Sequence, residues 1–375
     1  MTISETEAKS ILRKHKEIDS WFISRYGMNL YRGCTHNCIY CDGRSEGYYV
    51  EGEFGKDVAV KVNAIEILKR ELDPKRKRTP FKRGFIMVGG GVSDSYQPIE
   101  KKYGLTRQVL ETISGYNFPV HMLTKSTLIE RDIDILKRIN ERSRAIVSFS
   151  FSSVDDGISA VLEPGVPPPS ARLETIERFK DAGIACGMFL LPVIPFVTDT
   201  AESIEQSVGA ARDAGIDFII FGGMTLKEGR QKDYFINATK ERYPELAAKY
   251  QRIYHYSKWG EPSKEYSNSI NLAFNAIARK YKMPVRIPPH LYRDILSEND
   301  RVVVMLEHID YMLKMQGEKS SLGYAAYSIS MVQEPLSEIK GELCKLKGIG
   351  DKTADIILEI LQTGTSSLYE RLLTG

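Results

Sequence analysis

The chain has 375 residues, of which 42% are hydrophobic and 27% are charged. These proportions are typical of globular proteins, and the length exceeds one small domain but allows one large barrel with a small appendage. The formal net charge of +3 excludes a general polycation, so any binding to nucleic acid must depend on local basic patches.

The cysteines and the N-terminus indicate the compartment. There are five cysteines, three of them within the short segment 34–41, which does not fit a disulfide framework and does fit a reducing environment. The first ten residues are polar, unlike a signal peptide, and no apolar run approaches the roughly 20 residues of a membrane span. We therefore expect a cytoplasmic protein.

From the N-terminus, residues 1–25 form a polar segment that we expect to be helical. After it, short apolar runs alternate with stretches of helical spacing, which predicts βα units and a parallel sheet. We expect an α/β fold, a partial (β/α)6 barrel over residues 26–250. The expected strands are 28–32, 85–88, 120–123, 145–151, 185–194 and 218–221, and the expected helices are 62–72, 106–113, 128–139, 172–182 and 202–214.

The segments beyond the barrel are harder to interpret. Residues 251–300 are predicted to be a helical extension and linker, in which Pro284–Pro289 is a linker or a docking arm. The one strong basic run is Lys75-Arg76-Lys77-Arg78, followed by Lys82 and Arg83. It fits either a solvated loop or a contact with a nucleic-acid backbone.

Barrels of this kind place their chemistry at the C-terminal ends of the strands, where the sequence has a cysteine loop. Cys34, Cys38 and Cys41 have the spacing Cys-x3-Cys-x2-Cys, and thiolates are soft ligands for iron–sulfur clusters or zinc. Three thiolates reach three corners of a [4Fe–4S] cluster and leave one iron open. The alternatives are a zinc site with His36 as fourth ligand and a purely structural or electron-transfer cluster.

This loop resembles the signature of the radical SAM superfamily, in which an aromatic residue precedes the third cysteine, here Tyr40. The resemblance implies a [4Fe–4S] cluster whose open iron binds S-adenosylmethionine. It also implies cleavage of that cofactor to a 5′-deoxyadenosyl radical by an electron from a low-potential donor such as ferredoxin or flavodoxin. The cofactor then carries the difficult chemistry, and the protein positions it.

A wider resemblance covers residues 26–250 and points to the branch that contains spore photoproduct lyase and the radical-type DNA-repair photolyases. It rests on the segments 29–34, 93–100, 123–126 and 163–165, and on Arg172. The resemblance implies cofactor contacts from six residues: Tyr40, Ser93, Asp94, Lys125, Ser150 and Arg172. Ser93 and Asp94 match contacts to the methionyl amine, Lys125 and Ser150 match polar contacts, and Tyr40 matches a residue against adenine.

One position departs from that branch. Spore photoproduct lyases resembling this chain carry a hydrogen-donating cysteine two residues before the Ser-Asp pair, where this sequence has Gly91. Spore photoproduct itself is therefore a doubtful substrate. Cys186 is a substitute donor only if its strand end reaches the site, because a lone cysteine among apolar residues is usually part of the core.

The C-terminal segment 301–375 has the pattern of a helix-hairpin-helix at Leu346–Ala354. Two glycines in such a turn let backbone amides approach a phosphate at a helix N-terminus. The segment resembles the N-terminal domain of family X DNA polymerases, although Ile356 stands where lyase-active members have a Schiff-base lysine. We expect nucleic-acid binding, without that lyase chemistry, through Lys345, Lys347, Gly348, Gly350 and Lys352.

Together these features predict a radical SAM enzyme that acts on nucleic acid, DNA more than RNA, with lesion reversal as the outcome that the resemblance favours. Two alternatives stay open. One is radical modification of RNA or tRNA bases, and the other is an iron–sulfur DNA-binding sensor without turnover.

Overall fold

The computed structural model describes residues 2–374 apart from 49, 51, 77–80, 255, 256 and 258. Lys77 and Arg78 of the basic run therefore lie outside the described residues. In the described part of the chain, no helix is long and apolar enough to cross a membrane.

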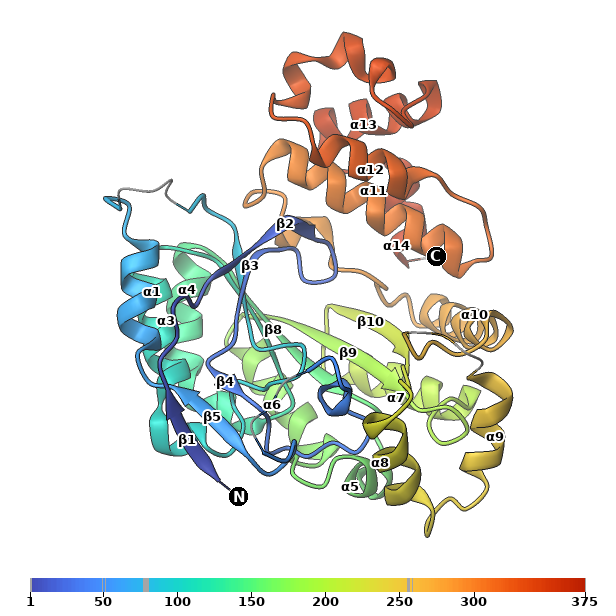
Figure 1. Ribbon diagram of the computed structural model, residues 1–375. Coiled ribbons are helices and arrows are strands. Elements are labelled where there is room, and N and C mark those ends of the chain that lie inside the picture. The colour runs from blue at the N-terminus through green and yellow to red at the C-terminus, as the bar shows by residue number, and fades with distance from the viewer. Residues whose placement is uncertain are drawn as a thin grey trace.

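The core of the molecule is a curled sheet of seven strands in the order β10-β9-β8-β7-β6-β3-β2 (Figure 1). The six strands from β3 to β10 pair in parallel, and β2 pairs antiparallel with β3. This confirms the expected partial barrel. The strands are β2 Arg13–Asp19, β3 Ser24–Met28, β6 Phe85–Val88, β7 Val120–Thr124, β8 Ala145–Phe151, β9 Ala185–Val193 and β10 Phe218–Gly223.

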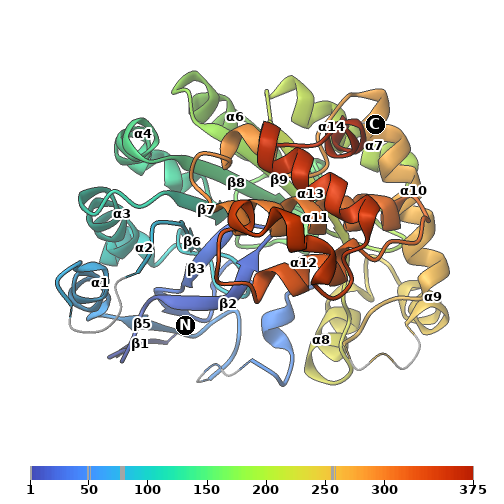
Figure 2. The ribbon, with the colours of Figure 1, turned by 90° about the horizontal axis from the view of Figure 1, so that it is seen from above.

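Continuous apolar runs form the central strands because both of their faces are covered. All seven residues of β8 are buried, as is usual for a parallel strand with helices outside and packed side chains inside. Helices cover the outer face of the sheet (Figure 2). These are α1 Ala64–Leu72, α3 Leu105–Gly115, α4 Ile133–Arg142, α6 Pro169–Asp181 and α7 Ala201–Asp213. The short helices α2 Glu100–Tyr103 and α5 Asp156–Leu162 belong to the connections that follow β6 and β8.

The expected N-terminal helix is wrong, because residues 1–25 contain strands. β1 Ile3–Thr6 joins a small sheet with β5 Val58–Lys61 and β4 Tyr31–Arg32, in the order β1-β5-β4. The strand expected over 28–32 is also wrong in its bounds, since β3 ends at Met28 and the chain turns before β4. Polar strands at a sheet edge give little periodic signal, because pairing through the backbone stabilises them more than burial does.

Residues beyond β10 form α8 Arg230–Thr239, α9 Leu246–Ile253 and α10 Lys264–Lys280. The arm at 284–289 is docked rather than loose. The Pro284 carbonyl accepts a hydrogen bond of 2.8 Å from the amide of Ile219, at the start of β10. Arg286 and Ile287 are buried.

The C-terminal helices α11 Glu298–Met315, α12 Leu322–Ser330, α13 Asp351–Thr363 and α14 Ser367–Thr374 form a separate domain. Its contacts reach residues next to the starts of barrel strands. Asp300 pairs with Arg25 of β3, and His308 Nε2 lies 2.8 Å from the Ser20 carbonyl.

This domain therefore sits where the barrel strands begin. Figure 1 shows it at one end of the barrel, whereas α5 and α8, which follow strand ends, lie at the other end. The two views agree, since the domain lies in front of the sheet when the molecule is seen from above (Figure 2).

Candidate active site

A cavity of about 100 Å³ lies at the C-terminal end of the barrel. Four segments meet there because each lies at the end of a strand of one of the two sheets: the cysteine loop after β4, the turn after β6, and the ends of β7 and β8 with Lys125 just beyond β7. The cavity is lined by Cys34, His36, Cys38, Cys41, Gly90, Gly91, Val92, Ser93, Asp94, Leu123, Thr124, Lys125 and Ser150.

The cysteine loop presents three free thiols to this cavity. Burial raises the pKa of Cys34 well above its usual value, that of Cys38 to about 12, and that of Cys41. Thiols in such an environment become thiolates when a soft cation compensates their charge, so ligation releases protons. The donor set therefore fits an iron–sulfur cluster.

A single zinc ion fits this loop less well. Among the described residues, no three His, Cys, Asp or Glu side chains converge as one metal ion requires. His36 is also engaged at both ring nitrogens, since Nδ1 lies 3.0 Å from the Gly165 carbonyl and Nε2 lies 3.1 Å from Asp94 Oδ2. The His36 ring therefore stabilises the loop through two hydrogen bonds and is not free to be a fourth metal ligand.

The Glu-Pro-Gly turn holds the cysteine loop in place. The amide of Gly165 donates to the His36 carbonyl at 3.0 Å, and the amide of Ile39 donates to the Leu162 carbonyl at 2.9 Å. A Cβ at position 165 would lie 2.6 Å from the carbonyl oxygen of Thr35, a distance that real Cβ atoms do not show. Glycine is required there because two backbones meet.

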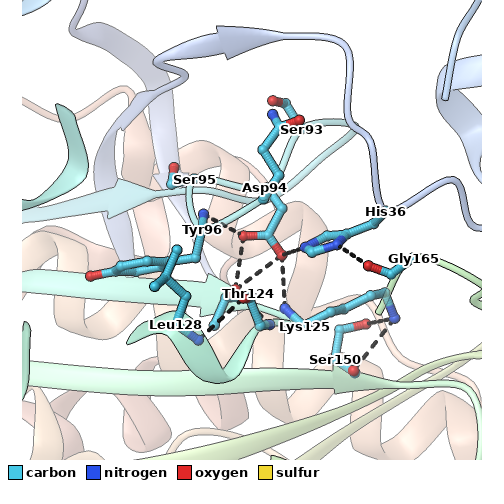
Figure 3. A network of polar contacts seen from close by, with 12 residues as sticks. His36, Ser93, Asp94, Ser95, Tyr96, Thr124, Lys125, Leu128, Ser150 and Gly165 are labelled. Carbon is cyan, nitrogen blue, oxygen red and sulfur yellow. Dashed lines mark hydrogen bonds and ion pairs between the residues drawn. The ribbon is translucent and has the colours of Figure 1, made fainter. Parts of the chain in front are cut away.

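Asp94 is a buried hydrogen-bond acceptor that ties the cysteine loop to the ends of β6 and β7 (Figure 3). Its carboxylate accepts from the amides of Tyr96 and Lys125, each at 2.8 Å, and from Thr124 Oγ1 at 2.8 Å, and it faces His36. Burial alone would raise the pKa of Asp94, but the imidazole of His36 and the amide donors hold it below its ordinary value.

Glu163 is a second buried acceptor, and sequence reasoning assigned it no role. Lys125 Nζ donates to Oε1 at 2.8 Å, Arg172 Nη2 donates to Oε2 at 2.7 Å, and the Tyr40 hydroxyl also donates to this carboxylate. Burial opposes its ionisation, but Arg172 and Lys125 hold the pKa of Glu163 well below its usual range. Ser152 and Ser159 complete the set of donors.

The predicted cofactor residues thus fall into two groups. Ser93, Asp94, Lys125 and Ser150 line the cavity with the three cysteines, whereas Tyr40 and Arg172 lie behind its wall, bonded to Glu163. Lys125 Nζ also donates to Ser150 Oγ at 2.9 Å (Figure 3). The wall therefore presents one ammonium whose position is fixed by a carboxylate and a hydroxyl.

The two positions discussed as hydrogen donors are far apart in the fold. Gly91 lines the cavity with a φ of +68°, and a Cβ there would meet nothing within 4 Å. Cys186 is the second residue of β9, fully buried, with Sγ 3.6 Å from the Ile184 carbonyl. Because strands enter the barrel at the end opposite the cavity, Cys186 is a core residue.

At the other end of the molecule, the hairpin turn before α13 has the expected shape. Gly348 has a φ of +77°, and the carbonyl of Gly350 accepts from the amides of Thr353 and Ala354, each at 2.9 Å. A side chain at position 348 would collide with the ring of Tyr324. The predicted contacts Lys345, Lys347, Gly348, Gly350 and Lys352 are all exposed.

Two protein-family models match the chain. One, the Radical SAM superfamily, matches residues 28–208, and the other, a helix-hairpin-helix domain, matches residues 297–366. Residues 28–208 form a radical SAM domain. Enzymes of this family use a [4Fe–4S] cluster and S-adenosylmethionine, which agrees with the fit of the three thiols.

Comparisons with whole proteins give relatives by sequence and a solved structure of similar fold. An uncharacterized protein of Mycobacterium tuberculosis is 29% identical over 287 residues, which are 76% of this chain and 82% of that protein. An uncharacterized protein of Methanocaldococcus jannaschii is 29% identical over 223 residues, 59% of this chain and 78% of that protein. A solved spore photoproduct lyase in complex with a dinucleoside spore photoproduct is similar with a TM-score of 0.54 and 16% identity, covering 74% of this chain and 79% of that one.

Proposed function

We propose that this radical SAM enzyme acts on nucleic acid, more specifically DNA, and reverses a lesion. The observation that carries the proposal is the pairing of two features in one chain. A cavity joins three cysteines to Lys125 and Ser150, and a separate domain carries an exposed hairpin of the phosphate-binding type.

In this proposal Cys34, Cys38 and Cys41 hold the [4Fe–4S] cluster. When bound, and with one electron from a low-potential donor, the cluster and S-adenosylmethionine would supply the radical chemistry that removes a hydrogen atom from the substrate. Lys125 lines the cavity with an ammonium that suits the carboxylate of the cofactor, because a fixed ammonium pairs strongly with a carboxylate. Ser150 holds this ammonium, since its hydroxyl accepts from Lys125 Nζ and donates to the Leu191 carbonyl, each at 2.9 Å. Ser93 donates to the Gly33 carbonyl at 3.0 Å, so its hydroxyl oxygen still has lone pairs that accept from an amine.

Tyr40 and Arg172 support the site from behind. Both bond to Glu163, which in turn orients Lys125, so we assign them a positioning role in place of direct contact with adenine or a carboxylate. The fully buried guanidinium of Arg172 also donates to the Ser150 carbonyl at 2.6 Å. It therefore fixes the end of β8 at the cavity wall.

The hairpin supports nucleic acid as the substrate class. Exposed amides and lysines at a helix N-terminus bind phosphate without reading base sequence. The structural likeness to spore photoproduct lyase is consistent with a lesion, but Gly91 leaves the cavity without the cysteine of that branch. We therefore propose a lesion other than spore photoproduct.

The decisive experiment follows deuterium. Reconstituted anaerobic protein with dithionite and S-adenosylmethionine is given deuterium-labelled DNA bearing ultraviolet lesions, or labelled RNA, and 5′-deoxyadenosine is analysed by mass spectrometry. Deuterium from DNA supports the proposal, and deuterium from RNA instead supports base modification. Release of 5′-deoxyadenosine without deuterium from either polymer contradicts a nucleic-acid substrate, and no release with an intact cluster supports the sensor. A Cys38→Ala variant is the control for cluster dependence.

A further inference from the structure

The hairpin and the cavity lie at opposite ends of the barrel, so one short stretch of nucleic acid does not reach both. The C-terminal domain contacts residues at the starts of strands, such as Arg25, whereas Lys125 and Ser150 stand at strand ends. The seven residues of β8 alone span roughly 20 Å at about 3.3 Å per residue. A polymer bound at the hairpin must therefore pass along the side of the barrel.

Strand β2 runs between these two ends. Asp19 pairs with Ser24 at the start of β3, next to the contact between Ser20 and the C-terminal domain. Arg13 pairs with Gly27 near the end of β3, from which the chain continues to the cysteine loop. β2 is the last strand of the seven-stranded sheet, so its outer edge has no partner strand within that sheet.

Three of the seven side chains on β2 are cationic and lie in the half nearer the cavity, whereas Glu17 and Asp19 lie in the half nearer the C-terminal domain. Arg13, Lys14 and Lys16 are exposed, and none of the three forms an ion pair with a carboxylate in the part of the chain that the structure describes. The half-buried Arg25 on the neighbouring strand, by contrast, is paired with Asp300. Unpaired cations in a row attract a polyanion more strongly than the same charges paired.

A second basic segment lies beside β2. Lys82 and Arg83 precede β6, are exposed, and likewise form no ion pair among the described residues. Tyr26 joins the two segments, because it is the pairing partner of Lys14 and its hydroxyl donates to the Lys82 carbonyl at 2.8 Å. Lys14 and Lys16 share one face of β2 and lie beside Lys82, whereas Arg13 projects from the opposite face, so the two segments form one surface around the free edge of β2.

We propose that this surface, the basic track of Arg13, Lys14, Lys16, Lys82 and Arg83, binds the nucleic-acid backbone between the hairpin and the cavity. The inference rests on the proposed function and makes it more specific, since the substrate is then a polymer and not a nucleotide. The seven residues of β2 extend over about 20 Å, which matches roughly six base pairs at 3.4 Å each.

The test compares two triple variants that lower the net charge equally. Arg13→Gln/Lys14→Gln/Lys16→Gln removes charge from the track. Lys137→Gln/Arg138→Gln/Arg142→Gln removes charge from α4, which lies on a different side of the barrel (Figure 2) and whose three cations are also exposed and unpaired among the described residues. The affinity of each reconstituted full chain for a 30-base-pair duplex is measured by fluorescence anisotropy at several salt concentrations.

We expect the track variant to bind about tenfold or more weakly at 0.1 M salt. The slope of log affinity against log salt should fall by about 0.9 for each lost phosphate contact, or roughly 2.7 in all. The α4 variant should bind within twofold of the unsubstituted chain. Uncoupled cleavage of S-adenosylmethionine by the track variant should be unchanged, which shows that the barrel is intact.

Other results overturn the inference. Equal losses in both variants would show that overall charge acts, not the track. Unchanged affinity together with new self-association of the track variant would show that the cations only protect a sheet edge from pairing with another chain, a common use of lysine there. If the unsubstituted chain does not bind the duplex, the nucleic-acid part of the proposed function fails, which is distinct from failure of the track alone.

Discussion

Replacing Glu163 by glutamine separates a positioning role from a purely structural one. Glu163 is 1% exposed and accepts from Lys125 and Arg172, which is itself 0% exposed. Removing one partner of a buried ion pair costs about 3–5 kcal/mol, because the remaining charge is left without compensation. With about 2.1 cal/mol/K of unfolding entropy per residue, a loss of about 4 kcal/mol lowers the Tm of this chain by roughly 5 °C.

The same change should weaken the binding of S-adenosylmethionine. Without its carboxylate partner, the ammonium of Lys125 is no longer held in one orientation at the cavity, so its interaction with the cofactor is weakened. A hydrogen bond to a charged group contributes about 1.5–3 kcal/mol. Equilibrium dialysis of the reconstituted protein should therefore give a Kd at least about tenfold higher. Iron content per chain should be unchanged, since the three cysteines remain.

The matched control is Glu100→Gln. Glu100 is 0% exposed and pairs with Arg131 at 2.7 Å, but it lies on α2 and does not line the cavity. We expect a smaller fall in Tm, because Arg131 is partly exposed and keeps Asp132 as a partner at 2.9 Å, and unchanged cofactor affinity. If Glu163→Gln lowers the Tm and leaves the Kd as in the control, Glu163 is a stabilising residue only and the positioning argument is refuted.

Three further predictions concern other parts of the chain. Burial lowers the pKa of His308 to about 3, so the unfolded state binds a proton that the folded state does not, and stability falls as the pH drops below about 6.5. His308→Gln should reduce the loss of unfolding free energy between pH 7 and pH 5 by about 2 kcal/mol, measured by urea denaturation, and an unchanged pH profile would contradict this. Gly165→Ala should displace the cysteine loop and lower the iron content per chain, because its Cβ would lie 2.6 Å from a backbone oxygen. The control Gly115→Ala should keep its iron, because its Cβ would meet nothing within 4 Å. Equal iron content in both variants would refute the argument that the backbone contact at Gly165 positions the loop. Gly348→Ala should collide with the ring of Tyr324 and weaken duplex binding several-fold with little change in cleavage of S-adenosylmethionine, and unimpaired binding would remove the hairpin from the nucleic-acid surface.

The sequence predicted the parts of this molecule whose signals are local. The apolar run at 145–151 is strand β8 without any change of bounds, since both faces of a parallel strand must be apolar. The cysteine spacing and the residues at strand ends were also visible, and the structure brings Cys34, Ser93, Lys125 and Ser150 to one cavity as the barrel rule requires.

Two features were hidden because they depend on distant partners. The strand at 13–19 is mostly polar and exists through pairing with β3, so its composition suggested a helix. In the sequence, Glu163 was only a part of the Glu-Pro-Gly motif. Its five hydrogen-bond donors come from segments as far apart as those of Tyr40 and Arg172. The periodicity of a sequence does not show which side chains from distant segments meet in the fold.

The position of the thiols limits the reactions that this site can complete. Among the residues that line the cavity, the cysteines are the three assigned to the cluster. Cys186 is buried at the start of β9, and the exposed Cys344 belongs to the C-terminal domain at the other end of the barrel. A reaction that ends with hydrogen donation from a protein thiol therefore lacks its donor within the described residues. If the site acts as proposed above, the open space at Gly91 would admit substrate, and the substrate or an external reductant would supply the last hydrogen.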